Sequence, residues 1–401
     1  MNISALKFTQ FRRYLIANII SLNGLWVQRI TIAWIAWELT GSASFVGFIA
    51  FLSYIPTMLT GPVFGVLVDR INVRHAAMAT QTLFFLIAFS AYLLQNLGLL
   101  TPVSLSIIAI IIGIVTSAQH PIRMAFTPRL VPKEHVGSVI VLIALNFNLA
   151  RVLGPAIGGV IIARSGVELA LLVAALAYLP AILTIATLKH RRRNRPDTKT
   201  SILSDFIDGL KFIKASSFIT NAMIITGLFS LTARGALEIL PTIADGGFGK
   251  GATGLGILTA AAGVGALSAA LLQSFAKSPE SGKLPASALA AAILGPVFVL
   301  FLGATNIWPL AIASVAGLGF FGTMVGISMQ TGIQMQLDDS IRGRVMSLWA
   351  MIALGATATG SIAIGALIDL VGLELTLQSI GGTSALLIGW QIWRGQGIGA
   401  K

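Results

Sequence analysis

Long apolar runs separated by short polar links make up most of this 401-residue sequence. A helix that crosses a bilayer needs about 20 apolar residues, and the runs reach that length. The pattern therefore predicts an all-α membrane protein with twelve transmembrane helices. We place them at residues 12–38, 44–68, 75–97, 102–125, 135–164, 167–188, 217–241, 251–276, 284–304, 307–335, 343–370 and 372–394.

The composition agrees with a chain that lies in lipid. Hydrophobic residues make up 56% and charged residues 10%, with a mean hydropathy of +0.88, whereas soluble domains carry about 25% charged residues. The first run is longer than the apolar core of a signal peptide and lacks a cleavage site, so we expect a retained helix. Cysteine is absent and the four histidines lack ligand spacing, so we expect no metal site.

The longest polar link divides the chain between the sixth and seventh predicted helices. It starts with a basic run at 189–196 and continues with apolar residues at helical spacing, which predicts an amphipathic helix on the membrane surface. We therefore expect a six-helix bundle at 1–188, a basic cytoplasmic linker at 189–216 and a second six-helix bundle at 217–401. The apolar face is formed by Ile202, Leu203, Phe206, Ile207, Leu210 and Ile213.

Most of the formal net charge of +13 lies in links whose positions indicate the orientation of the chain in the membrane. If the links alternate between the two sides, the side with both termini holds 22 of the 27 Lys and Arg residues. The other side holds only Arg164 and Lys250. The positive-inside bias then predicts cytoplasmic termini in an inner (cytoplasmic) membrane, and no nucleic-acid partner is needed to explain the charge.

The two halves resemble each other when the sequence is shifted by 206 residues. The chance alternative, coincidence among small residues, is weakened by Arg29 and Arg234, which differ by 205 and occupy the first and seventh helices. The aligned identities are Gly137 with Gly343, Val139 with Val345, Leu142 with Leu348, Ala144 with Ala350, Ala150 with Ala356, Gly154 with Gly360 and Gly159 with Gly365.

The segment 65–74, Gly-Val-Leu-Val-Asp-Arg-Ile-Asn-Val-Arg, resembles the loop motif of the major facilitator superfamily. The resemblance implies that Gly65 allows close helix approach and that Asp69, Arg70 and Arg74 form a cytoplasmic gating network. Asn72 replaces the turn glycine of the family, and we expect it to adopt the left-handed backbone that Asn tolerates. The second-half counterpart near residues 276–278 lacks the Asp and Arg.

The segment 150–159 resembles the Gly-Pro, Gly-Gly motif of exporters and proton antiporters in the same superfamily. The resemblance implies a pliable contact at Gly154, Pro155, Gly158 and Gly159, while ordinary small-residue packing is the alternative. Segments 37–42, 121–123 and 342–345 are similar to the enterobactin-exporter-like, drug-efflux branch, which assigns Arg342 and Arg344 to the gate. The family further implies alternating access in a monomer within the lipid bilayer and no cofactor beyond a proton gradient.

Of the charged residues within the predicted helices, four are assigned to the interior of the membrane and to neither rim: Arg29, Arg151, Arg234 and Glu238. An Arg near a helix centre costs about 2.5–3.5 kcal/mol on insertion scales, so a polar cavity is the usual reason for one. The net charge of the four is +2, which favours an anionic or electron-rich small-molecule substrate. The alternative is that Arg234 and Glu238 form a buried ion pair and that Arg151 caps carbonyl groups.

Uncharged side chains on the same helices are further candidates for substrate binding, although each also suits helix packing. Glu238 is our candidate proton carrier, because desolvation would favour its protonated form while pairing with Arg234 would oppose it. The uncharged candidates are Asn23, Trp26, Gln119 and Asn146, with His120, Asn148, Gln330 and Gln334 as weaker ones.

These features favour a secondary transporter that exports a siderophore-like or drug-like molecule in exchange for protons. A proton-linked importer of an organic anion has the same fold and stays open as an alternative. No Gly-x-Ser-x-Gly, His-Glu-x-x-His or Walker sequence occurs, which disfavours a membrane enzyme and excludes an ATP-driven pump. A channel fits poorly with a six-plus-six repeat that carries rocking motifs.

Overall fold

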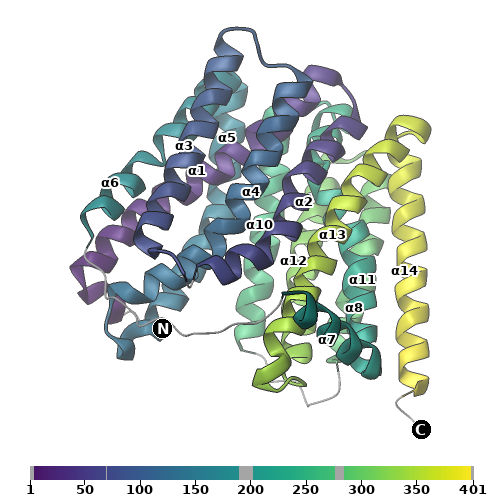
Figure 1. The fold of residues 1–401 in the computed structure, drawn as a ribbon. Helices are drawn as coiled ribbons and strands as arrows, with labels where there is room; N and C mark the ends of the chain where they lie inside the picture. The colour runs from purple at the N-terminus through teal and green to yellow at the C-terminus, as the bar shows by residue number, and fades with distance from the viewer. Residues whose placement is uncertain (1–3, 69, 189–201, 276–283, 399–401) are drawn as a thin grey trace. The chain divides into compact units, whose positions relative to one another are not determined.

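The computed structural model describes residues 4–68, 70–188, 202–275 and 284–398, and the secondary structure in these ranges is helical (Figure 1). The α-helices are α1 (Thr9–Thr40), α2 (Ala43–Leu67), α3 (Val73–Asn96), α4 (Pro102–Phe126), α5 (Val136–Leu176), α6 (Leu179–Thr187), α7 (Ile202–Ala215), α8 (Ser217–Phe229), α9 (Gly235–Glu238), α10 (Gly251–Ser274), α11 (Ala286–Ala304), α12 (Trp308–Gln334), α13 (Asp339–Val371) and α14 (Leu373–Ile398). The short helices are η1 (Ser4–Lys7), η2 (Thr127–Leu130), η3 (Lys133–His135), η4 (Ser230–Arg234) and η5 (Thr242–Gly247).

The all-helical membrane fold is confirmed. Nine helical stretches of the described ranges are long and apolar enough to cross a membrane, or ten with a bent pair that includes α7 and α8. One stretch of 55 residues breaks at Gly166, whose φ of 85° suits glycine, and so supplies both the fifth and the sixth predicted helix. The count of twelve therefore stays a prediction that these elements can accommodate.

Helix starts follow local capping chemistry. Thr101 and Ser104 form a reciprocal capping box at the start of α4, with Pro102 in the first turn. Asn72 caps α3 by accepting hydrogen bonds from the backbone N–H groups of Arg74 and His75. The expectation of a left-handed Asn72 was wrong, because its φ of −75° is the extended conformation that an N-cap residue needs.

The predicted surface helix exists as α7. Its axis and that of the following span differ by 106°, so α7 runs across the direction of α8 (Figure 1). Ser216 makes this corner possible, because its side chain caps α8 and accepts from the backbone N–H of Ile219. The basic run at 189–196 and the segment 276–278 lie outside the described residues.

Contacts divide the chain into two units. Unit 1 comprises residues 1–40, 55–198 and 250–260, and unit 2 comprises residues 41–54, 199–249 and 261–401. In unit 1, α1 packs mainly on α5, and in unit 2, α11 packs on α12 and α14. The predicted boundaries at 188 and 216 stay predictions, since the unit borders also fall inside α2 and α10.

The aligned glycines of the repeat make corresponding contacts. A Cβ added at Gly154 would lie 2.5 Å from the Cβ of Trp26 on α1, and one at Gly360 would meet the backbone of Leu231 next to α8. The first pair lies within unit 1 and the second within unit 2. The 206-residue shift therefore aligns positions with the same packing contacts as well as the same residue types.

Candidate functional site

Four side chains of unit 1 form a row in which guanidinium groups and rings alternate. Arg29 lies over the ring of Trp26 at 5.5 Å, Trp26 meets Phe147 edge to face at 6.1 Å, and Arg123 lies over Phe147 at 5.4 Å. The residues come from α1, α5 and α4, and we call them the arginine–aromatic row. Arg29 is exposed and the other three are half-buried, so the row is within reach of a ligand.

Two glycines of the fifth-helix motif bring α5 against α1 beside this row. A Cβ at Gly154 would clash with Trp26, and one at Gly158 would lie 2.6 Å from the side chain of Ile30. Because neither glycine has a side chain, the backbones approach closely enough for Trp26 to contact Phe147. These two motif positions therefore serve packing within unit 1.

The other unit 1 candidates have different surroundings. Asn146 is buried and donates to Oδ1 of Asn18 at 3.0 Å, which ties α5 to α1. Asn23 donates to the carbonyl of Ile19, while its own Oδ1 is buried without a hydrogen-bond partner in the described part of the chain. Arg151 lies one turn after Phe147 on α5, and Gln119 is buried in α4.

A second polar group lies in unit 2, where the seventh predicted span is irregular. Glu238 accepts a hydrogen bond from the Tyr54 hydroxyl at 2.7 Å, and Arg234 donates to the carbonyl of Gly322 on α12 at 3.2 Å. The Arg234 guanidinium also interacts electrostatically with Tyr54 and Glu238. The span departs from α-helical geometry in the π-helical turn η4, which ends at Arg234, and such turns are frequent at functional sites. Neither this turn nor the hydrogen bond from Tyr54 is predictable from the residue pattern.

Two glycine-lined contacts join helices of opposite sequence halves. In the α2–α13 crossing, within unit 2, a Cβ at Gly47 would meet the backbone of Ser361, and one at Gly365 would meet that of Ala43. In the α5–α10 crossing, within unit 1, a Cβ at Gly159 would lie 2.6 Å from Cα of Gly256. Gly159 and Gly365, which the repeat aligns, thus serve equivalent crossings.

Asp369 adds hydrogen bonds to the α2–α13 crossing alone. Its carboxylate accepts from the Ser42 hydroxyl at 2.7 Å and from the backbone N–H groups of Ala43 and Ser44 at 3.0 and 2.9 Å. These are the first groups of α2, where a helix favours negative charge. Sequence analysis missed Asp369, although an acidic residue at the end of an apolar run was the available signal.

The comparisons with known proteins agree with one another. The sequence profile of the transmembrane secretion effector family matches residues 2–394, which is nearly the whole chain. The chain belongs to this family of major facilitator superfamily transporters. It is therefore a multi-pass membrane transporter and not an enzyme.

Two relatives of this chain are named for the molecules that they transport, staphyloferrin A and enterobactin. The staphyloferrin A transporter of Staphylococcus aureus is 25% identical over 371 residues, which cover 89% of each chain. The enterobactin exporter of Shigella boydii is 26% identical over 388 residues, covering 92% of this chain and 87% of the relative.

Solved structures share the fold at lower identity. A nucleoside transporter superposes with a TM-score of 0.75 at 14% identity, covering 96% of this chain and 98% of the other. The human organic anion transporter MFSD10 superposes with a TM-score of 0.64 at 16% identity, covering 95% and 99%. These similarities confirm the fold class predicted from the sequence.

The loop motif of the superfamily is only partly built as the resemblance implies. Arg74 donates through Nε to the carbonyl of Ile185 at 2.9 Å and through Nη2 to that of Ala186, so it caps the end of α6. A Cβ at Gly65 would meet none of the described atoms within 4 Å, so no close helix approach depends on it here. Arg70 is exposed, and Asp69 lies outside the described residues.

The basic pair before the eleventh predicted helix contacts two different elements. Arg344 pairs with Asp208 of α7 at 3.4 Å, and Arg342 donates to the carbonyl of Leu337 at 3.0 Å. Arg344 therefore ties the surface helix to α13 within unit 2. The gating roles assigned to both arginines by resemblance stay predictions.

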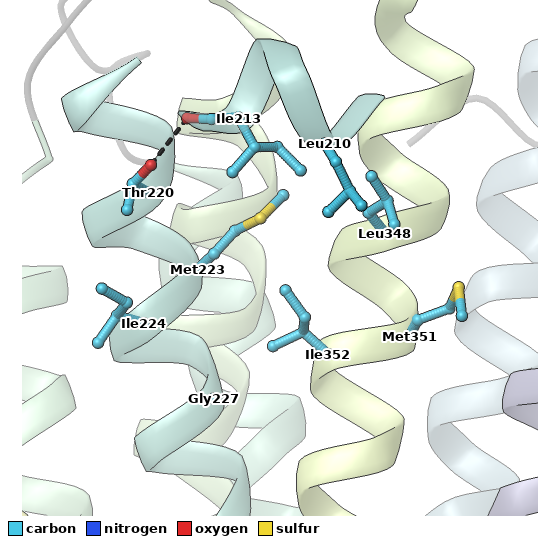
Figure 2. A pocket seen from close by; sticks show the side chains of 9 residues that line it. All are labelled: Leu210, Ile213, Thr220, Met223, Ile224, Gly227, Leu348, Met351 and Ile352. Carbon is cyan, nitrogen blue, oxygen red and sulfur yellow. Dashed lines mark hydrogen bonds between the residues drawn. The ribbon is translucent and has the colours of Figure 1, made fainter. Parts of the chain in front are cut away.

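A cavity of about 530 Å³ under α7 has the wrong chemistry for an anion. Figure 2 shows apolar side chains of α7, α8 and α13 around it, and the Thr220 hydroxyl donates to the carbonyl of Ile213 at 2.7 Å. None of the nine described residues that line it is charged. In the part of the chain that the structure describes, no group of three His, Cys, Asp or Glu residues could hold a metal.

Proposed function

We propose that this chain exports a small siderophore-like or drug-like anion by alternating access, in exchange for protons. The observation that carries the proposal is the placement of three arginines in apolar helices. Arg29 and Arg151 lie in helices that pass the criteria for membrane spans, and Arg234 lies in the bent helix pair that passes them together. Cations at that depth are costly unless they serve a polar pathway, and they attract anionic substrates. The names of both relatives, which transport staphyloferrin A and enterobactin, support a siderophore-like substrate, and the name of the enterobactin exporter supports outward transport.

Glu238 is the proton carrier in this proposal. Glu238, Tyr54 and Arg234 form one polar group. Glu238 accepts a hydrogen bond from Tyr54 and interacts electrostatically with Arg234. Because Glu238 and a substrate anion would both interact with Arg234, the protonation state of Glu238 and the binding of the anion would be linked. Proton exchange and anion transport would then share one binding site.

Gradient-driven flux in proteoliposomes tests the coupling. Glu238→Gln should abolish flux driven by a pH gradient while substrate binding stays measurable, because the amide cannot exchange a proton. Glu168→Gln is the matched control, since Glu168 accepts a hydrogen bond from Gln95 within unit 1 and has no contact with Glu238 in the described hydrogen bonds. Unchanged coupling in Glu238→Gln would remove Glu238 from the mechanism.

The direction of transport separates the exporter from a proton-linked importer of an organic anion. Cells that produce the chain should lose a preloaded siderophore-like anion faster than cells that lack it. Net accumulation would favour the importer. We further propose cytoplasmic termini in the inner membrane and a monomer, because the positive-inside count supports that orientation.

A further inference from the structure

The arginine–aromatic row contains groups that can recognise more of a ligand than its negative charge. Arg123 is one of the 22 Lys and Arg residues that the sequence assigns to the side of both termini, and its guanidinium lies over the ring of Phe147 within unit 1. The inference below rests on the proposed function and names the class of substrate that the row would recognise.

Three buried polar atoms have no hydrogen-bond partner within the described residues: Nε of Arg123 and Nε1 of Trp26, which belong to the row, and Oδ1 of Asn23, a residue one turn before Trp26 on α1. The first two are donors and the third is an acceptor. A buried polar atom without a partner is destabilising, so a molecule that satisfied all three would gain binding energy. Such a molecule must carry acceptors for the two N–H groups and a donor for Asn23.

The charge of the surrounding helices and the aromatic rings of the row further restrict the class of ligand. Through residue 165 of α5, the helices α1, α4 and α5 contain only one carboxylate, Glu38 at the end of α1. A ligand carboxylate would therefore supply negative charge that these helices lack, in a geometry that suits a guanidinium. The surface between Arg123 and Arg29 consists of the Phe147 and Trp26 rings, which favour a flat aromatic group.

We propose that the row binds an aromatic carboxylate that also carries a hydroxyl group. The carboxylate contacts Arg123, the ring packs on Phe147 and Trp26, and the hydroxyl donates to Oδ1 of Asn23. A phosphate would make no use of the rings, and an uncharged aromatic molecule would make no use of the arginines. Arg123 and Phe147 are thus specificity-determining residues.

Equilibrium binding to the purified full-length protein tests this without any gradient. The probes are salicylate, cyclohexanecarboxylate, which lacks the aromatic ring and the hydroxyl, and phenol, which lacks the carboxylate. Wild type should bind salicylate most tightly. Phe147→Leu should weaken salicylate by about 3- to 10-fold, the range expected for one aromatic contact, and leave cyclohexanecarboxylate unchanged. Arg123→Gln should weaken both carboxylates by about tenfold or more and leave phenol unchanged.

Two further variants separate recognition from folding. Phe147→Tyr keeps the ring and should restore salicylate binding to the wild-type level. Arg394→Gln removes a cation that also lies over a ring, that of Trp390 on α14, and should change no affinity. Equal losses for salicylate and cyclohexanecarboxylate in Phe147→Leu, or no loss of carboxylate binding in Arg123→Gln, would overturn the inference. Failure of the proposed function would instead appear as absent gradient-driven flux while salicylate binding follows this pattern.

Discussion

The α2–α13 and α5–α10 crossings use similar glycines but differ in their polar contacts. Gly47 and Gly365 let α2 approach α13, while Gly159 and Gly256 let α10 approach α5. Only the α2–α13 crossing adds Asp369, with three hydrogen bonds to the start of α2. The repeat places Ala163 where Asp369 stands in the second half.

This difference predicts that the two crossings contribute unequally to the equilibrium between closed and open conformations. Both crossings involve helix ends that the topology predicts to face away from the cytoplasm, so both would have to separate when that side opens. Separation of α2 from α13 must break charge-assisted hydrogen bonds, which contribute about 1.5–3 kcal/mol in favourable cases. We therefore expect the α2–α13 crossing to set the conformational equilibrium.

Overfilling a crossing should have the largest effect. Gly365→Leu places a side chain where the backbone of Ala43 lies, and overpacking of this kind costs about 1–3 kcal/mol. We expect gradient-driven flux to fall at least about tenfold, since 1.4 kcal/mol corresponds to a factor of ten. Gly389→Leu is the control, because a Cβ there would meet nothing within 4 Å. Equal flux in the two variants would show that close packing at Gly365 is dispensable.

Removing the charge of Asp369 should come next. Asp369→Asn keeps the size of the side chain but weakens its hydrogen bonds to Ser42, Ala43 and Ser44. The apparent melting temperature should fall, and the population with the crossing separated should rise. A melting temperature equal to that of wild type would argue against a stabilising role for the carboxylate.

Adding a carboxylate to the simpler crossing should have a smaller and opposite effect. Ala163 is exposed on α5 one turn after Gly159, as Asp369 is one turn after Gly365. Ala163→Asp should therefore stabilise the start of α10 by about 0.3–1 kcal/mol through the helix dipole. Thermal unfolding measures this gain, with Ala163→Asn as the uncharged control. A gain of the same size in both variants would exclude a charge effect.

The smallest effect should come from the ion pair between α7 and α13. Arg344 and Asp208 are 33% and 47% exposed, and exposed pairs contribute about 0.2–1 kcal/mol. Arg344→Gln should lower the melting temperature slightly at low salt and not at high salt, because salt screens exposed charges. A large loss at both salt concentrations would assign Arg344 a role beyond this pair.

The sequence predicted the parts of the molecule that depend on local periodicity. The apolar runs predicted the spans, and the repeat aligned Gly154 with Gly360, whose packing contacts correspond in the structure. It could not predict that Arg123 lies over Phe147 or that Tyr54 bonds Glu238, because those pairs depend on which helices pack together. Asn72 shows a third case, in which one residue type suits both a left-handed turn and an N-cap.

Distance measurement across the α2–α13 crossing tests the central claim most directly. The chain has no cysteine, so spin labels at Phe45→Cys and Leu370→Cys report on this crossing, and labels at Ala163→Cys and Thr253→Cys report on the other. Pulsed electron–electron double resonance between the two labels of each pair should show a second, longer distance under conditions that drive transport. Asp369→Asn should increase that population about tenfold or more, the factor that corresponds to 1.4 kcal/mol. A single unchanged distance across α2–α13, with and without Asp369→Asn, would contradict the account.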